Sequence, residues 1–145
     1  PVTLSRERAI ELILNQIKPD SSVVSSTGMI SRELYELRDH FKQNHDTDFL
    51  TVGSMGHCSQ IALGIAVTNS NKRVICLDGD GAAIMHMGSM AIVGQASSAN
   101  LLHVILNNGR HDSVGGQPTI SFDIDFGKIA KSFNYNCNYI YLIFI

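Results

Sequence analysis

The sequence predicts an α/β domain in which helices sandwich a parallel β-sheet. Runs such as residues 73–77 and 101–106 are apolar at nearly every position, which is typical of strands buried on both faces of a sheet. Between these runs lie longer segments whose apolar residues recur at helical spacing. With 145 residues, 44% of them hydrophobic and 17% charged, the chain has the composition of one folded domain over residues 1–145 rather than of a disordered segment.

The first half alternates between helix and strand. Residues 4–17 predict a helix, and its apolar face is made by Ala9, Leu12, Ile13 and Ile17. A short β-branched run at 22–26 predicts the first strand. Ser31 is expected to cap the next helix, because its hydroxyl is a good acceptor for free amides at a helix start. The apolar positions of that helix are Leu34, Leu37 and Phe41. Residues 48–52 predict a second strand, which ends at Gly53.

The second half continues the same alternation. Helices are expected over residues 57–67, 85–96 and 126–133. Strands are expected over residues 73–77, 101–106 and 139–145. The tail 134–145 consists almost entirely of Asn, Tyr, Ile, Phe and Leu, so it is either the last strand of a truncated domain or a stretch read out of frame. We assign it no function.

Charge and cysteine content exclude several classes of protein. Eleven Lys and Arg against 13 Asp and Glu give a net charge of −2, which provides no general attraction to nucleic acid or to an acidic membrane. No apolar run approaches the roughly 20 residues needed to span a bilayer, and no basic leader precedes a hydrophobic segment. Cys58, Cys76 and Cys137 are odd in number and lack metal-binding spacing, so we expect small buried side chains and a cytoplasmic protein.

Glycine and small polar residues follow four consecutive predicted strands. They are Thr27-Gly28, the segment 53–56, the segment 79–81 and Asn107-Asn108. Ligand sites in parallel α/β sheets lie beyond the carboxyl ends of the strands. One such end would be an ordinary turn, whereas four together indicate a ligand that lies across this edge of the sheet.

The strongest signal is Gly79-Asp80-Gly81, followed after residues 82–106 by Asn107-Asn108. Asp80 and Asn108 offer hard oxygen atoms of the kind that Mg²⁺ or Ca²⁺ prefers. A single carboxylate holds Mg²⁺ poorly, so a phosphate-bearing ligand is expected to supply the remaining charge. Close backbone approach and helix-start amides would accommodate that phosphate. The residues that would provide them are Gly79, Gly81, Ala82 and Ala83.

This pattern resembles the diphosphate-binding (PP) domain of thiamine-diphosphate-dependent enzymes, whose signature is Gly-Asp-Gly, a spacer of similar length and Asn-Asn. The resemblance implies thiamine diphosphate and Mg²⁺ as cofactors. It also implies that the Mg²⁺ ligands are Asp80, the side chain of Asn108 and the backbone carbonyl of Arg110. Two unrelated turns are the alternative interpretation.

Two further segments resemble the same family. Met55 would wedge between the two rings of the cofactor, and the carbonyl of Gly53 would accept from its 4′-amino group. Thr27-Gly28 would border the diphosphate, as would the backbone amide of Ser113. Taken alone, the Met55 pattern favours a core residue, and the Gly-Asp-Gly pattern reverses that interpretation. Thr27-Gly28 could equally be a plain turn before the next helix.

The segments 27–34, 53–57, 77–88 and 107–119 are most similar to phosphonopyruvate decarboxylases. The sulfopyruvate decarboxylase β subunits are the runner-up. The resemblance implies conversion of 3-phosphonopyruvate to phosphonoacetaldehyde and CO₂, within phosphonate biosynthesis. His111 would donate a proton or bind the substrate, although it could equally order its own turn through Asp112. Candidates for the substrate phosphonate are Arg110, Arg32 and His57.

The resemblance also implies that a second domain is required. Enzymes of this family use a glutamate of a pyrimidine-binding (Pyr) domain to activate the cofactor. The four glutamates of this chain lie on predicted helices, where solvated faces are the default; they are Glu7, Glu11, Glu33 and Glu36. We therefore expect half an active site, which needs a partner chain or a missing N-terminal half, in keeping with the opening Pro-Val-Thr. A homo-oligomer of PP–Pyr pairs is expected.

Two other classes of protein remain open at this stage. A non-catalytic nucleotide-binding module is disfavoured because no Gly-x-Gly-x-x-Gly follows a predicted strand. A non-functional fragment would also explain the absent Pyr domain and the unusual tail.

Overall fold

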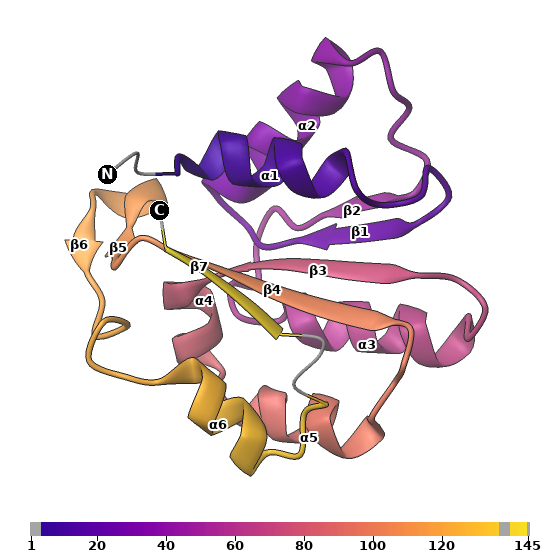
Figure 1. Cartoon of the computed structure of the whole chain (residues 1–145). Helices are drawn as coiled ribbons and strands as arrows, with labels where there is room; N and C mark the ends of the chain where they lie inside the picture. The colour runs from indigo at the N-terminus through magenta and orange to yellow at the C-terminus, as the bar shows by residue number, and fades with distance from the viewer. Residues whose placement is uncertain (1–3, 137–139, 145) are drawn as a thin grey trace.

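The computed structural model describes residues 4–136 and 140–144. Its centre is a five-stranded parallel sheet with the order β2-β1-β3-β4-β7 (Figure 1). The strands are β1 (Ser22–Ser25), β2 (Asp48–Leu50), β3 (Val74–Gly79), β4 (Leu101–Asn107) and β7 (Ile140–Phe144). The predicted fold class is confirmed. The last strand is also confirmed over its described residues, whereas Cys137, Tyr139 and Ile145 lie outside them.

Helices cover both faces of the sheet. Figure 1 shows α1 and α2 on one face and the other four helices on the opposite face. The helices are α1 (Arg6–Leu14), α2 (Met29–His40), α3 (Cys58–Thr68), α4 (Asp80–Met85), α5 (Gly88–Ala96) and α6 (Phe126–Ser132). Neighbouring strand residues serve opposite cores, because Val23 packs with α1 and α2 while Val24 packs with α3. No helix among the described residues has the length and apolarity needed to cross a membrane.

The first helix begins at a side-chain cap. The hydroxyl of Ser5 accepts from the backbone N–H of Arg8 at 3.2 Å, which satisfies one of the free amides at the helix start. We expect Ser5→Ala to lower the free energy of unfolding by about 1 kcal/mol, because that amide loses its acceptor. Ser5→Thr keeps the acceptor and should stay close to the wild type. Chemical denaturation of the two variants checks this, and equal losses in both would contradict the capping role.

Three sequence expectations need correction. Ser31 does not cap a helix: α2 begins two residues earlier, and the buried Ser31 hydroxyl contacts the Ser25 hydroxyl at 2.7 Å and the Ser26 carbonyl at 2.8 Å. The serine therefore fastens α2 to the end of β1. The helix expected over 85–96 is two helices, which break at 86–87. The second strand stops at Leu50, and Val52 beyond it is 95% exposed.

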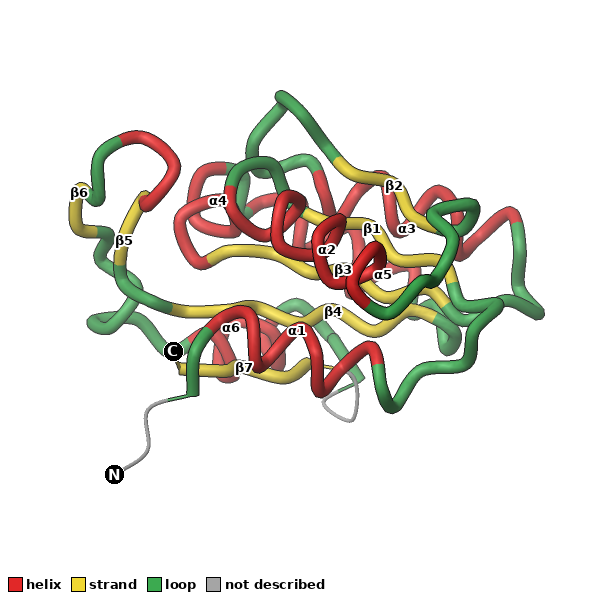
Figure 2. Tube along the Cα trace, turned by 90° about the horizontal axis from the view of Figure 1, so that it is seen from above, coloured by secondary structure: helices red, strands yellow, loops and turns green. Residues whose placement is uncertain are grey.

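The order of the strands creates a crevice. From β1 the chain moves to the edge strand β2 in one direction, while β3, β4 and β7 extend the sheet in the other. Connections that leave neighbouring strands in opposite directions open a gap at their carboxyl ends, where ligands bind in sheets of this type. Beyond the carboxyl end of β4, β5 (Arg110–His111) and β6 (Gln117–Pro118) form a small separate arm around the 3₁₀ turn η1 (Asp112–Val114) (Figure 2).

Candidate functional site

A hollow lies at the carboxyl ends of β1, β3 and β4, at the crevice created by the strand order. Most of the residues singled out from the sequence line it. They are Thr27, Met55, Gly79, Asp80, Gly81, Ala82, Asn108, Arg110, His111 and Ser113. Segments from four parts of the chain thus meet at one place, although their individual roles in binding stay predictions.

Three predicted site residues lie elsewhere. Gly28 and Gly53 line a neighbouring groove, which shares Met55 and Ser113 with the hollow. Gly28 has a φ of +100°, and a Cβ there would come within 3.0 Å of the Ser113 side chain, so the close approach of these two segments depends on glycine. Ala83 lies on α4 and is buried in the core.

Asp80 is a buried carboxylate that faces the hollow. It begins α4 directly after β3 and is only 2% exposed. One oxygen accepts from the Thr119 hydroxyl at 2.5 Å, and the other from the Asn108 backbone N–H at 3.4 Å. Within the described ranges, no Lys, Arg or His forms an ion pair with it. A buried carboxylate without a compensating charge is costly, so this position suits a bound cation.

The two asparagines after β4 have different roles. Asn107 is fully buried, and its side-chain oxygen accepts from the Ser121 hydroxyl at 2.7 Å and from the Gly109 backbone at 3.1 Å. It stabilises the turn. Asn108 faces the hollow, where its side-chain oxygen accepts from the Arg110 backbone N–H at 3.0 Å. Only the second asparagine therefore offers an oxygen atom to a ligand.

The donor set fits Mg²⁺. Asp80 supplies a charged oxygen that lacks a cation, and Asn108 supplies an amide oxygen from the adjacent strand end. Both are hard ligands of the type that Mg²⁺ takes, and the Arg110 carbonyl belongs to the same loop. Gly81 lies directly beneath the His111 ring, so any side chain at this position would displace the ring from the hollow.

The sequence interpretation missed Arg6 and misplaced Glu33. Glu33 was expected on a solvated face, but it is 6% exposed and receives two hydrogen bonds from Arg6, at 2.7 and 2.8 Å. Arg6 also donates to Asp112 at 2.8 Å and lines the hollow. The hydrogen bonds to Glu33 raise the pKa of Arg6 above its usual value, while burial acts in the opposite direction. These partners lie 27 and 106 residues apart, which periodicity does not reveal.

The candidates for an anionic substrate are also separated. Arg110 lines the hollow with an exposed side chain. Arg32 lines the neighbouring groove instead. His57 is exposed beside His86, with ring centroids 4.3 Å apart, and does not reach the hollow. Thr119, at the end of segment 107–119, donates to Asp80 and is a site residue that the sequence pattern does not reveal.

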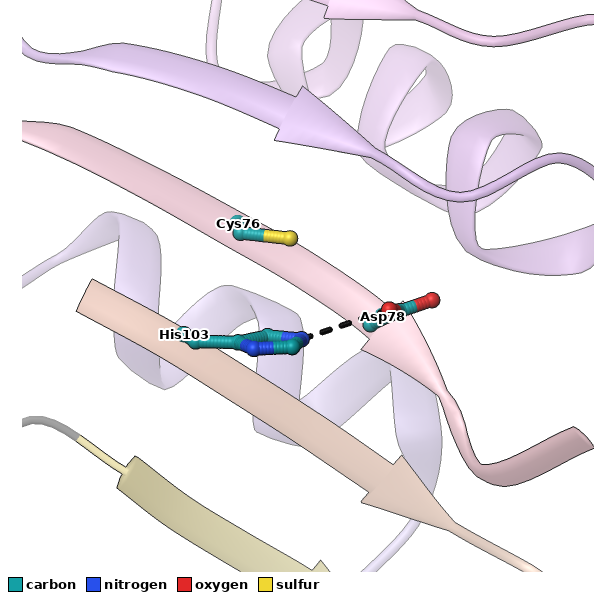
Figure 3. Close-up of side chains that lie close together, drawn as sticks. All are labelled: Cys76, Asp78 and His103. Carbon is teal, nitrogen blue, oxygen red and sulfur yellow. Dashed lines mark hydrogen bonds and ion pairs between the residues drawn. The ribbon is translucent and has the colours of Figure 1, made fainter. Parts of the chain in front are cut away.

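A line of polar side chains begins directly before the Gly-Asp-Gly turn, and Figure 3 shows its two fully buried members, Asp78 and His103. One carboxylate oxygen of Asp78 accepts from the Gly79 backbone N–H at 3.0 Å, and the other lies 3.2 Å from Nε2 of His103. The second ring nitrogen of His103 lies 3.2 Å from the Tyr135 hydroxyl. Burial raises the pKa of that hydroxyl, which favours its neutral form. The line ties the turn that carries Asp80 to β4 and to the end of α6.

Cys76 lies beside this line, and its Sγ is 3.4 Å from that of Cys58. Both thiols are free and buried, as expected, and burial raises the pKa of each. Because the thiolate is the reactive form, we expect neither to react with a disulfide reagent at pH 8 in the folded protein, and both to react after unfolding. A thiol titration of the Cys137→Ser variant measures this. Rapid labelling of the native protein would contradict the expectation.

Known proteins of one enzyme family are similar in sequence to this chain. The family model for the thiamine pyrophosphate enzyme C-terminal TPP binding domain matches residues 26–143. Over 131 residues the chain is 42% identical to phosphonopyruvate decarboxylase of Streptomyces hygroscopicus, covering 90% of this chain but 31% of that protein. It is 38% identical over 133 residues to sulfopyruvate decarboxylase subunit beta of Methanothermobacter thermautotrophicus, covering 92% of this chain and 68% of the subunit.

A solved structure shows the same fold. Benzoylformate decarboxylase from Polynucleobacter necessarius superposes with a TM-score of 0.72 at 15% identity. The match covers 100% of this chain and 34% of that enzyme. The chain thus spans about a third of the phosphonopyruvate decarboxylase and of this structure, and about two thirds of the sulfopyruvate decarboxylase subunit.

Proposed function

Because this chain belongs to the thiamine pyrophosphate enzymes as their C-terminal TPP-binding domain, we propose that it holds thiamine diphosphate through Mg²⁺ in the hollow above β1, β3 and β4. The observation that carries the proposal is Asp80, a buried carboxylate that faces the hollow without a cationic partner among the described residues. Asp80, the Asn108 side chain and the Arg110 carbonyl would bind the ion. The backbone from Gly79 to Ala82 would lie against the diphosphate.

The reaction we propose is decarboxylation of 3-phosphonopyruvate to phosphonoacetaldehyde and CO₂. The support is the similarity to two phosphonopyruvate decarboxylases, at 42% and 41% identity, together with the segment 107–119. When bound, the cofactor supplies an electron sink for the charge left by the departing CO₂. His111 lies over Gly81 beside the hollow and would deliver a proton there or bind the substrate. Arg110 is the candidate guanidinium for the phosphonate.

Sulfopyruvate is the second candidate substrate. The chain is 38% identical to a sulfopyruvate decarboxylase β subunit and covers 68% of it, against 31% of the phosphonopyruvate decarboxylase. A sulfonate and a phosphonate are tetrahedral anions of similar size, and either would pair with Arg110. Coverage thus favours the subunit arrangement, whereas identity slightly favours phosphonopyruvate.

A Pyr domain is the proposed partner. Exposed apolar side chains surround the groove beside the hollow, including Val52 at 95%, Val114 at 63% and Tyr35 at 47% exposure. Apolar clusters next to a ligand site are typical of interaction surfaces. Glu33 is held by Arg6, and we propose that a glutamate of the partner activates the cofactor. The buried free thiols of Cys58 and Cys76 agree with a cytoplasmic location, which we also propose.

The test is CO₂ release by the chain assembled with its Pyr domain, with thiamine diphosphate and Mg²⁺ supplied. Phosphonopyruvate, sulfopyruvate and pyruvate are compared by kcat/KM. The proposal expects a clear preference for phosphonopyruvate, and a preference for sulfopyruvate would select the second candidate. Cofactor binding without CO₂ release from any of the three would overturn the reaction.

A further inference from the structure

We propose that Asp112, clamped by Arg6 and Glu33, is a positioning residue that sets the orientation of the Asn108 amide toward the metal ion. This inference rests on the proposed function, because it concerns the Mg²⁺ that accompanies thiamine diphosphate. None of these three residues is a proposed ligand of the ion. A continuous set of short polar contacts runs from Glu33 through Arg6 and Asp112 to Asn108.

Asp112 determines which end of the Asn108 side-chain amide faces the ion. The Asn108 Nδ2 donates to Oδ2 of Asp112 at 2.7 Å, and an ionised carboxylate only accepts hydrogen bonds. Asp112 therefore selects the nitrogen end of the amide and leaves the oxygen end on the opposite side. That oxygen accepts from the Arg110 backbone N–H at 3.0 Å and keeps a second lone pair for a cation. A flipped amide would instead present an NH₂ group, which repels a cation.

Arg6 and Glu33 form the clamp that holds Asp112. Arg6 donates from one terminal nitrogen to the same Oδ2 of Asp112, at 2.8 Å, and from its other two nitrogens to Glu33. Asp112 alone lies on an exposed turn, with 36% of its side chain accessible. Arg6 and Glu33 are anchored on α1 and α2, with 17% and 7% of their side chains accessible. The helices thus fix a carboxylate that its own loop would leave free to rotate.

The charge of the Arg6 guanidinium is already compensated. Arg6 lines the hollow, but its guanidinium faces two carboxylates and is compensated by them. It is therefore not a free cation for a phosphate or a phosphonate. Its contact with Asp112 also makes a direct role for that carboxylate at the metal ion unfavourable. If Asp112 were a ligand, removing Arg6 would strengthen metal binding, whereas a positioning role requires the removal to weaken it.

The experiment measures Mn²⁺ in place of Mg²⁺ by electron paramagnetic resonance, with the chain assembled with its Pyr domain and with thiamine diphosphate. Asp112→Ala removes the acceptor of the amide. The paired variant Arg6→Gln with Glu33→Gln removes the clamp without leaving a buried charge unpaired. Arg8→Gln with Glu11→Gln is the matched control, because this pair on the same helix, 2.6 Å apart, lies away from the hollow. Thermal unfolding of the metal-free proteins confirms that each variant is folded.

We expect Asp112→Ala and the Arg6/Glu33 pair each to raise the Mn²⁺ dissociation constant about 10- to 100-fold, the usual effect of losing a residue that orients a ligand. The Arg8/Glu11 pair should leave it unchanged. Asp112→Asn should recover part of the loss, since its amide oxygen still accepts from Asn108. Unchanged affinity in Asp112→Ala, or tighter binding in the Arg6/Glu33 pair, would overturn the positioning role while the proposed function stands. A wild-type assembly of this chain with its Pyr domain that takes up no Mn²⁺ with the cofactor would overturn both.

Discussion

Asp80→Asn is expected to abolish the binding of Mg²⁺ and thiamine diphosphate, with at least a 100-fold loss of affinity. The loss should exceed the roughly 10- to 100-fold typical of residues that only orient ligands, because a charged oxygen next to the ion disappears. Isothermal titration of the cofactor at fixed Mg²⁺ measures it. Asp123→Asn is the matched control, since Asp123 is exposed on the loop that follows Thr119 and lies outside the hollow.

The same substitution is expected to leave the metal-free protein as stable as the wild type, or more stable. Asp80 is 2% exposed, and no described residue forms an ion pair with it, so burying its charge without a cation is costly. Asparagine keeps an oxygen that can accept from the Thr119 hydroxyl, which lies 2.5 Å from the aspartate. The free energy of unfolding without ligands therefore separates the two roles.

Cofactor binding should reverse this order of stability. A ligand at 100 times its dissociation constant stabilises the folded state by about 2.7 kcal/mol, and the variant would lose that gain. Thermal unfolding with and without Mg²⁺ and thiamine diphosphate reports both effects in one experiment. A variant that is less stable than the wild type without ligands, yet is stabilised equally by them, would show that Asp80 is structural and not a metal ligand.

The elements that were predictable from the sequence are those with a strong local pattern. The apolar runs in β3 and β4 are buried on both faces, and the periodic segments that became α3 and α6 lie close to their expected bounds. The position of the candidate hollow was also predictable from the sequence. Parallel strands place their carboxyl ends at one edge, so residues that follow the strands meet even when they are far apart in the chain.

The parts that failed depend on contacts between elements. Ser31 has the composition of a cap, but its hydroxyl finds better acceptors at the end of β1, and this contact places it inside the helix. Glu33 has the sequence surroundings of a solvated helix residue, and its contact with Arg6 on another helix cannot be read from them. Gly28 and Gly53 line the groove beside the hollow, and their predicted contacts with the cofactor stay predictions. Such outcomes arise from packing, which residue spacing does not encode.

His103→Ala is expected to cost about 3–5 kcal/mol of folding free energy, the usual effect of leaving one member of a buried pair without its partner. His103 and Asp78 are each 1% exposed, and the pair is 3.2 Å apart. Among the described residues, the variant would leave the buried Asp78 carboxylate with the Gly79 amide as its remaining hydrogen-bond partner. Domains have a total stability of about 5–15 kcal/mol, so such a loss is a large fraction of the whole.

The position of the pair extends this cost to the functional site. Asp78 holds the amide of Gly79, one residue before Asp80, and His103 links that contact to Tyr135. A loosened Asp78 should therefore weaken metal binding in whatever fraction of His103→Ala remains folded. Chemical denaturation gives the stability, and Mn²⁺ binding of the folded fraction gives the effect on the site. His40→Ala, on the exposed end of α2, is the control and should change stability by less than about 0.5 kcal/mol. If His103→Ala were as stable as that control, the buried line would contribute nothing, and the Gly-Asp-Gly turn would owe its shape to its backbone alone.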